Sequence, residues 1–139
     1  MKKKTHNKLV RDRIPNIIIG HGLSFKARKL DAVEFENELT NKLVEEAKDV
    51  AEKVQWLNRK CEQEPVSKEE HDLDMQEIKE ELADVLEVYI HLVKSLELTT
   101  KDIEVAANEK RAKRGSFEDR IYLEWTEDAN EANKKGKLK

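Results

Sequence analysis

The chain contains two pairs of carboxylates, each pair spaced three residues apart. Glu46 and Asp49 form the first pair, and Glu81 and Asp84 form the second. Residues at i and i+3 project from the same side of a helix, so each pair can direct both carboxylates at one cation. Oxygen ligands suit hard divalent ions such as Mg²⁺ or Mn²⁺ rather than zinc. The spacing therefore predicts a site at which these acids share one divalent ion.

The alternative is that each pair belongs to an ordinary solvated face, because acids at this spacing are frequent on acidic helices. Both pairs, however, hold equivalent places in the pattern, since Glu46, Asp49, Glu81 and Asp84 each directly precede an apolar residue. Clustered carboxylates repel one another and raise each other's pKa, so a fold that gathers them favours a cation. We therefore expect the four acids to be metal ligands.

The first pair lies in a stretch with helical periodicity. Asp31 is the predicted N-cap, and Glu34 follows three residues later in a capping-box pattern. We expect this helix to fray between Asn58 and Ser67, where Pro65 interrupts a polar stretch. Its apolar positions step by three and four along the chain: Leu39, Leu43, Ala47, Val50, Val54 and Leu57.

The second pair lies in a second periodic stretch, capped by Ser67 with Glu70. The two matched stripes predict an antiparallel hairpin. At about 100° per residue each acid pair lies roughly a quarter-turn from its stripe, so we expect a third helix or a second subunit to wall the site. The second stripe consists of Met75, Ile78, Leu82, Val85, Tyr89, Leu92 and Leu96.

Shorter elements flank the predicted hairpin. Residues 7–19 form a short amphipathic segment, and a third helix begins at Thr99 or Thr100 and runs to Arg114. The expected fold is all-α, a helical bundle of two long antiparallel helices plus shorter helices, completed by oligomerisation. We place the domain at residues 1–125 and a polar C-terminal tail at residues 126–139.

Composition agrees with a helical protein. The 139 residues suffice for one domain, and 41% charged residues with 5% aromatics, 4 Gly and 2 Pro argue against sandwiches and barrels. No apolar run approaches a membrane span, and the N-terminal residues lack the apolar stretch of a signal peptide, so we expect a cytoplasmic protein without a membrane partner. Cys61 is the single cysteine and forms no internal disulfide.

Charge is partitioned along the chain. Residues 1–30 carry a net charge of +8, residues 31–109 carry −14, and residues 110–139 carry +3. An acidic central body opposes a duplex, so we expect no nucleic-acid partner. The layout suits a protein that holds a divalent metal centrally and phosphate peripherally, although solvated helices with basic ends would also produce it.

These motifs resemble the all-α nucleotide pyrophosphatases, specifically the MazG-like and phosphoribosyl-ATP pyrophosphohydrolase-like group. Its signature is a helix with EExxE and a later helix with ExxD, represented here by Glu45, Glu46 and Asp49 and by Glu81 and Asp84. The chain departs from that pattern in two places. An aspartate stands at position 49 where the group usually has a glutamate, and the link between the two acidic helices is long.

Further motifs of the group recur along residues 7–123. The group often opens with a KLVRDxIP-like segment, matched by residues 8–15, and its third helix often carries N-x-K followed by a basic pair. Here Asn108 and Lys110 match the N-x-K motif, and residues 113–114 match the basic pair.

The resemblance implies hydrolysis of a nucleoside triphosphate between its α and β phosphates, giving monophosphate and pyrophosphate. Mg²⁺ or Mn²⁺ would be the cofactor, held by the four acids, because phosphoryl transfer chiefly needs charge neutralisation and an in-line nucleophile. Glu45, beside the ligands, is the candidate for orienting or deprotonating the attacking water, with an exposed helix acid as the alternative.

The candidate substrate-binding residues are basic or amidic. Lys110 and Arg114 lie four apart, so both can face one phosphate chain, or they can simply complement the helix dipole. Asn108 is the candidate for reading a base edge. Lys8 and Arg11 can contact phosphate, or they can pair with the acidic body.

Three functions remain open at this point. The leading one is a house-cleaning nucleotide pyrophosphatase acting as a homodimer or homotetramer. The others are a non-enzymatic helical interaction module whose acids only solubilise it, and a phosphoribosyl-ATP pyrophosphohydrolase of the same fold.

Overall fold

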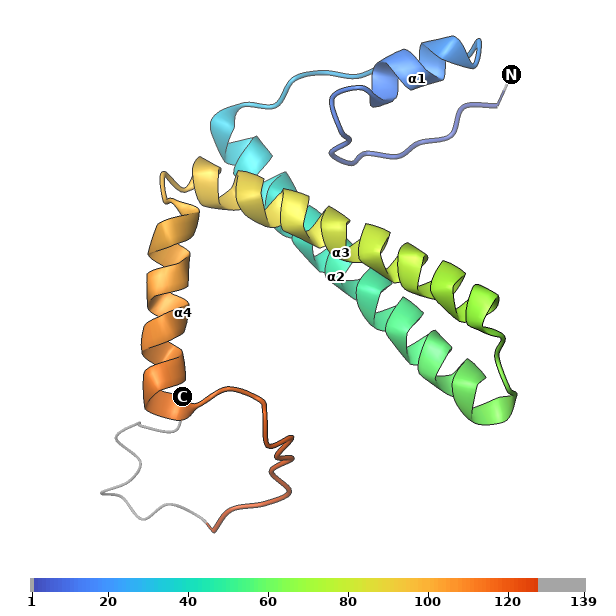
Figure 1. The fold of residues 1–139 in the computed structure, drawn as a ribbon. Helices are drawn as coiled ribbons and strands as arrows, with labels where there is room; N and C mark the ends of the chain where they lie inside the picture. The colour runs from blue at the N-terminus through green and yellow to red at the C-terminus, as the bar shows by residue number, and fades with distance from the viewer. Residues whose placement is uncertain (1, 128–139) are drawn as a thin grey trace. The chain divides into compact units, whose positions relative to one another are not determined.

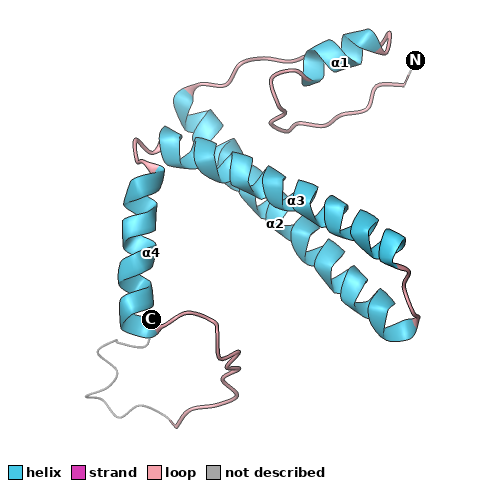
Figure 2. Cartoon of the chain, viewed as in Figure 1, coloured by secondary structure: helices cyan, strands magenta, loops and turns pink. Residues whose placement is uncertain are grey.

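The computed structural model describes residues 2–127, and this part of the chain contains four helices and no strand. They are α1 (Ile14–Gly20), α2 (Ala32–Gln63), α3 (Lys68–Ser95) and α4 (Thr100–Arg114), joined by the loops drawn in Figure 2. The prediction of an all-α fold is thus confirmed for the described residues. The predicted polar tail, residues 126–139, lies outside the described residues from residue 128 onward.

Helix α2 begins where the capping pattern predicts. The carboxylate of Asp31 accepts a hydrogen bond from the backbone N–H of Glu34 at 2.8 Å. The Glu34 carboxylate is paired instead with the Arg28 guanidinium, at 2.7 and 3.3 Å. The N-cap prediction is therefore confirmed, while the second half of the expected capping box is replaced by an ion pair with the preceding loop.

The far end of α2 differs from the prediction. The helix does not fray after Asn58 but continues to Gln63. Leu57 is buried, and Lys60 pairs with both Glu70 and Asp74 of α3, at 2.9 Å to Asp74 Oδ2. These contacts hold the last turn of α2 against its neighbour, which local propensity alone does not encode.

Helix α3 packs along α2, and Figure 1 shows it running back after a short link. Ser67 caps α3, accepting from the backbone N–H of Glu70 at 3.2 Å. At the other end of the pair, the Ser95 hydroxyl donates to Glu36 Oε2 at 3.0 Å. The buried apolar side chains between the two helices are Leu39, Leu57, Ile78, Val88 and Val93.

The buried face of each helix overlaps the predicted stripe only in part, since Leu39, Leu57 and Ile78 are buried as predicted. Ala47 is exposed while its neighbour Glu46 is only 9% exposed, and Leu82 is 51% exposed while Glu81 is half-buried. Glu46 and Glu81 are therefore covered together with part of each stripe, which the expected quarter-turn between acids and stripe did not anticipate. Each helix has more apolar width than one partner covers, and in this chain the covered part includes the acids.

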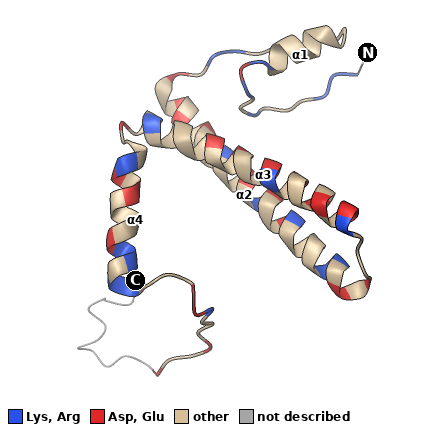
Figure 3. Ribbon diagram, viewed as in Figure 1, with Lys and Arg blue, Asp and Glu red and all other residues tan. Residues whose placement is uncertain are grey.

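Helix α1 is short and follows a basic segment, as Figure 3 shows by charge. Pro15 stands in its first turn, where a missing N–H costs nothing, and Gly22 after its end adopts φ +72°.

The chain divides into two compact units, Met1–Ile103 and Glu104–Lys139. Helix α4 begins in the first and continues into the second. It has a reciprocal cap, in which Asp102 N–H donates to Thr99 Oγ1 and Asp102 Oδ2 accepts from Thr99 N–H and Oγ1–H. Gly115 follows its last residue at φ +77°.

Candidate metal centre

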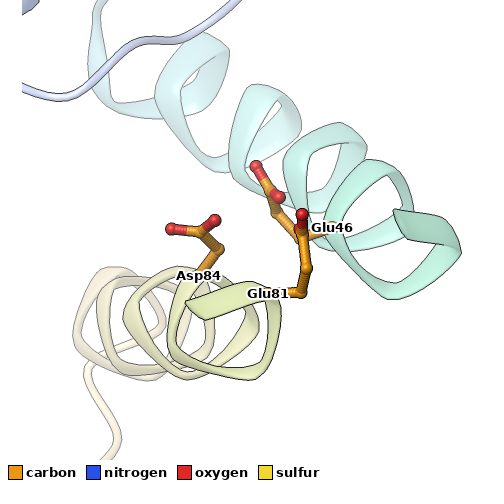
Figure 4. A group of neighbouring side chains, drawn as sticks. All are labelled: Glu46, Glu81 and Asp84. Atoms are coloured by element: carbon orange, nitrogen blue, oxygen red, sulfur yellow. The ribbon is translucent and has the colours of Figure 1, made fainter. Parts of the chain in front are cut away.

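Three of the four predicted metal ligands converge between α2 and α3. Glu46 on α2 and Glu81 and Asp84 on α3 each offer a carboxylate oxygen, and these oxygens all lie within 4.8 Å of one another. Figure 4 shows the three side chains directed into the space between the two helices. Glu46 is buried and the other two are half-buried.

The positions of these acids follow from the packing of the two helices. Glu46 lies seven residues after the buried Leu39, which is two helical turns on the same face. Glu81 lies between Ile78 and Val88, both buried against α2. The apolar residues that hold the helices together therefore also fix the carboxylates opposite one another.

Repulsion within the cluster is visible at Glu81. Desolvation and the neighbouring carboxylates of Asp49, Asp84 and Glu46 raise the pKa of Glu81, and Lys53 partly opposes this. Asp49 thus lies near enough to act on Glu81 electrostatically, although it is not one of the three residues whose oxygens come within 4.8 Å. The sequence-based expectation of four ligands is matched in geometry by three.

The donor set fits a hard divalent cation. Three carboxylates from two helices, partly removed from water and mutually repulsive, supply only oxygen ligands. A cation bound among them would relieve the repulsion that raises the pKa of Glu81. The residues present therefore suit Mg²⁺ or Mn²⁺ better than a metal that prefers nitrogen or sulfur.

Lys42 is a member of the site that sequence reasoning did not single out. Its ammonium lies 3.2 Å from Glu46 Oε1 and 3.4 Å from Glu45 Oε1, and its side chain is only 17% exposed. Desolvation lowers the pKa of Lys42, but the carboxylates of Glu46 and Glu45 outweigh it and raise the pKa. The available signal was its position one helical turn before both acids.

Glu45 lies beside the cluster and is held by two lysines. Lys42 contacts both of its carboxylate oxygens, and the ammonium of Lys8 lies 3.8 Å from Oε1. The Glu45 side chain is 41% exposed, so water has access to it. The catalytic role of Glu45 stays a prediction, and ion pairs with the two lysines hold its carboxylate in place.

The N-terminal candidates Lys8 and Arg11 also reach the cluster. Arg11 Nη2 donates to Asp84 Oδ1 at 2.5 Å, and Lys8 contacts Glu45. Both therefore pair with the acidic body, which was the alternative to phosphate binding. Arg11 pairs with an acid of the cluster, Lys8 pairs with the adjacent Glu45, and their role in phosphate binding stays a prediction.

The three candidates on α4, Asn108, Lys110 and Arg114, belong to the second compact unit. The Asn108 side-chain oxygen accepts a hydrogen bond from Arg111 at 2.6 Å. Lys110 and Arg114 are exposed, and the last turn of α4 is basic, as the helix-dipole alternative expects. Their role in substrate binding stays a prediction.

A shallow hollow lies elsewhere, at the end of α2. Trp56 lines it, and the ammonium groups of Lys53 and Lys60 each lie 4.8 Å from the centre of the Trp56 ring. Trp56 is ten residues beyond Glu46, roughly 15 Å along the helix. The hollow is therefore separate from the acid cluster.

A helical pair with converging carboxylates and adjacent cations has a donor set that could hold a divalent metal ion. The family model for the MazG nucleotide pyrophosphohydrolase domain matches residues 35–116, more than half of the chain. The chain therefore belongs to the family of MazG nucleotide pyrophosphohydrolase domains. That range includes all four acids, Glu45 and the three α4 candidates.

Neither the comparison with curated proteins nor the comparison with solved structures gives a match. Among the described residues, no helix combines the length and apolar character needed to cross a membrane.

Proposed function

We propose that this protein hydrolyses a nucleoside triphosphate, or a deoxynucleoside triphosphate, between the α and β phosphates in a Mg²⁺-dependent reaction. Water is consumed, and the products are the nucleoside monophosphate and pyrophosphate. The observation that carries the proposal is the convergence of Glu46, Glu81 and Asp84 from two helices. Membership of the MazG family supports the reaction class, and a house-cleaning role is part of the proposal.

The residues divide the work as follows. Glu46, Glu81 and Asp84 would hold the divalent ion, with Asp49 beside them. When bound, that ion supplies charge neutralisation to the phosphates and acidifies water. Glu45 orients the attacking water and accepts its proton, and Lys42 keeps the Glu45 carboxylate in place at 3.4 Å.

Basic residues receive the triphosphate. Lys8 and Arg11 already lie at the cluster, so they are the first candidates to contact phosphate oxygens. We also assign phosphate contacts to Lys110 and Arg114 and a base contact to Asn108, as the matched motifs of α4 imply. The monophosphate and pyrophosphate leave once the bond between the α and β phosphates is broken.

We propose that the active form is a homodimer or homotetramer built from the domain at residues 1–125. Glu45 and Asp84 lie on one side of the α2–α3 pair, since one short N-terminal segment contacts both. Helical geometry places Ala47, Leu82 and Leu86 on the other side, where all three are exposed. A second copy covering this apolar side would complete the core without blocking the acids.

The proposed activity is tested by measuring pyrophosphate release from a panel of canonical and modified NTPs and dNTPs with and without Mg²⁺. Glu46→Gln and Glu81→Gln are each expected to lower the rate at least 100-fold, because removing one ligand weakens charge stabilisation at the phosphates. Circular dichroism should show that both variants keep their helicity.

Glu80→Gln is the matched control, since Glu80 is an exposed acid directly beside Glu81. Its rate should stay within about twofold of wild type. If the wild-type protein releases no pyrophosphate from any nucleotide, the enzymatic reading fails and the helical interaction module takes its place. If the protein releases pyrophosphate from phosphoribosyl-ATP and from no other nucleotide, the alternative of a phosphoribosyl-ATP pyrophosphohydrolase is favoured.

A further inference from the structure

The ion pair between Arg11 and Asp84 joins two distant parts of the sequence at one carboxylate of the cluster. Arg11 Nη2 lies 2.5 Å from Asp84 Oδ1, and the two residues are 73 positions apart. Arg11 comes from the segment before α1, whereas Asp84 is on α3. The same carboxylate belongs to the group whose oxygens lie within 4.8 Å of one another.

A guanidinium and a divalent cation compete for such a carboxylate. Both are attracted to the same oxygens, and two positive charges a few ångströms apart repel each other. A divalent ion bound at Asp84 would therefore weaken its pairing with Arg11. Lys8, three residues earlier, pairs with Glu45 at 3.8 Å.

The exposure of the pair makes such an exchange feasible. The Arg11 side chain is 59% exposed and that of Asp84 is 39% exposed. Ion pairs in this setting contribute little net stability, since water solvates both partners when they separate. Neither the segment that holds Arg11 nor the short helix α1 contributes a buried residue to the core between α2 and α3.

We propose that Arg11 is an exchangeable counter-ion: it holds Asp84 in the metal-free protein, leaves it when a divalent ion binds, and then takes up a phosphate group of the substrate. This inference rests on the proposed function, because it assigns a sequence of partners to a residue of that site. Its chemical basis is that a planar guanidinium binds carboxylate and phosphate with the same bidentate geometry.

The first test measures Mn²⁺ binding without nucleotide, by electron paramagnetic resonance, in the full chain. Arg11→Gln is expected to bind Mn²⁺ about three- to fivefold more tightly than wild type, because the ion does not have to displace the Arg11 guanidinium. An exposed ion pair of this kind changes the affinity by up to roughly that factor. The difference should shrink at 0.5 M KCl, where exposed charges are screened.

Arg28→Gln is the matched control. It removes the same charge from the same compact unit, but its partner is Glu34 at the start of α2. Its Mn²⁺ affinity should equal that of wild type. Unchanged affinity in Arg11→Gln would overturn the exchange, and weaker affinity would overturn it by showing that Arg11 positions Asp84 as a ligand.

The second test follows the Arg11 guanidinium itself by nitrogen-15 NMR. Its N–H signals should be slow to exchange with water in metal-free protein, exchange rapidly with Mg²⁺ alone, and slow again with Mg²⁺ and inorganic tripolyphosphate. Signals that ignore Mg²⁺ would contradict the proposal.

The two proposals fail in distinguishable ways. If wild type binds no Mn²⁺ at all, the metal site is wrong and the exchange falls with it. If Mn²⁺ binds and pyrophosphate is released but Arg11→Gln gives no gain in affinity, only the exchange is wrong.

Discussion

At the residue scale, the main feature is a group of neighbouring carboxylates between α2 and α3. Glu46, Glu81 and Asp84 share one space between α2 and α3, and the pKa of Glu81 is raised as a consequence. Lys42, Lys8 and Arg11 offset part of the negative charge from the rim. The carboxylates therefore repel one another, and a divalent ion bound among them would stabilise the site.

Glu81→Gln should stabilise the metal-free protein at pH 7 by a few tenths to about 1 kcal/mol, because it removes one of the repelling charges. The pKa of Glu81 is raised above its ordinary value of 4.5 in the folded chain, so the folded state binds this proton more tightly than the unfolded state. Its ionisation therefore costs stability as the pH rises through the raised pKa, and the advantage of the variant should disappear below about pH 4. Urea unfolding at several pH values measures this.

Adding Mg²⁺ should reverse the order, stabilising wild type more than Glu81→Gln. If Glu81→Gln is less stable than wild type at pH 7 without metal, the proposed repulsion at Glu81 is contradicted.

Lys42→Met should lower the free energy of unfolding by about 1 to 2 kcal/mol, because it leaves Glu45 and Glu46 without the cation that contacts both. Methionine keeps the aliphatic stem, so lost packing is small. Lys48→Met, whose pairing with Glu52 is exposed, is the control and should change stability by less than about 0.5 kcal/mol. Equal effects of the two substitutions would show that Lys42 is an ordinary surface lysine.

At the element scale, the helix starts were predictable, and the buried helix faces were predictable only in part. The caps at Asp31 and Ser67 are local signals, read directly from a side chain and the N–H three residues later. The end of α2 depends on Lys60 meeting Glu70 and Asp74 of another helix, and no local signal encodes that meeting.

The site shows the same division. Spacing identified Glu46, Glu81 and Asp84 because i, i+3 geometry is local. It predicted that acids of the two helices share one ion, but not that Glu46 is buried, because the apolar band of each helix is wide enough to pack in more than one rotation. Nor did it predict Lys42, since a lysine one turn before two acids is common on any helix surface.

The start of α4 gives a further prediction. Thr99→Ala should destabilise the first turn of α4 by about 1 kcal/mol, measured as faster amide hydrogen exchange at Asp102 and Ile103. Thr100→Ala, which leaves the bonds between Thr99 and Asp102 in place, is the control.

The effect of Thr99→Ala should also depend on pH. Hydrogen bonds from the Thr99 backbone N–H and hydroxyl lower the pKa of Asp102 below its ordinary value of 3.8. The part of the stabilisation that comes from the Asp102 carboxylate is therefore complete above that value and is lost as the pH falls through the lowered pKa, whereas the bond from the Asp102 N–H to Thr99 Oγ1 does not depend on pH. A difference between variant and wild type that persists undiminished at pH 2 would contradict this assignment.

At the scale of the whole molecule, the amount of exposed apolar surface is the main observation. Among residues 2–127, five apolar residues are buried, while Leu82, Leu86 and others on α3 remain about half exposed. A single pair of helices of this length rarely supplies enough buried area for a stable fold. We therefore propose self-association through the side of α3 that carries Leu82 and Leu86.

Leu86→Glu should shift the protein from a dimer or tetramer to a monomer in light scattering, with loss of thermal stability, because the charge would be buried at the contact. Leu73→Glu is the control, since Leu73 is 69% exposed and lies off the Leu82 and Leu86 side by helical geometry. A wild-type protein that is monomeric at micromolar concentration would contradict the proposed assembly.

The central claim is that carboxylates of α2 and α3 hold a divalent ion. Anomalous diffraction from crystals grown with Mn²⁺ tests it most directly. We predict a peak about 2.2 Å from oxygens of Glu46, Glu81 and Asp84, with Arg11 no longer on Asp84. A structure in which Mn²⁺ binds elsewhere, or not at all, while these three side chains extend into solvent would contradict it.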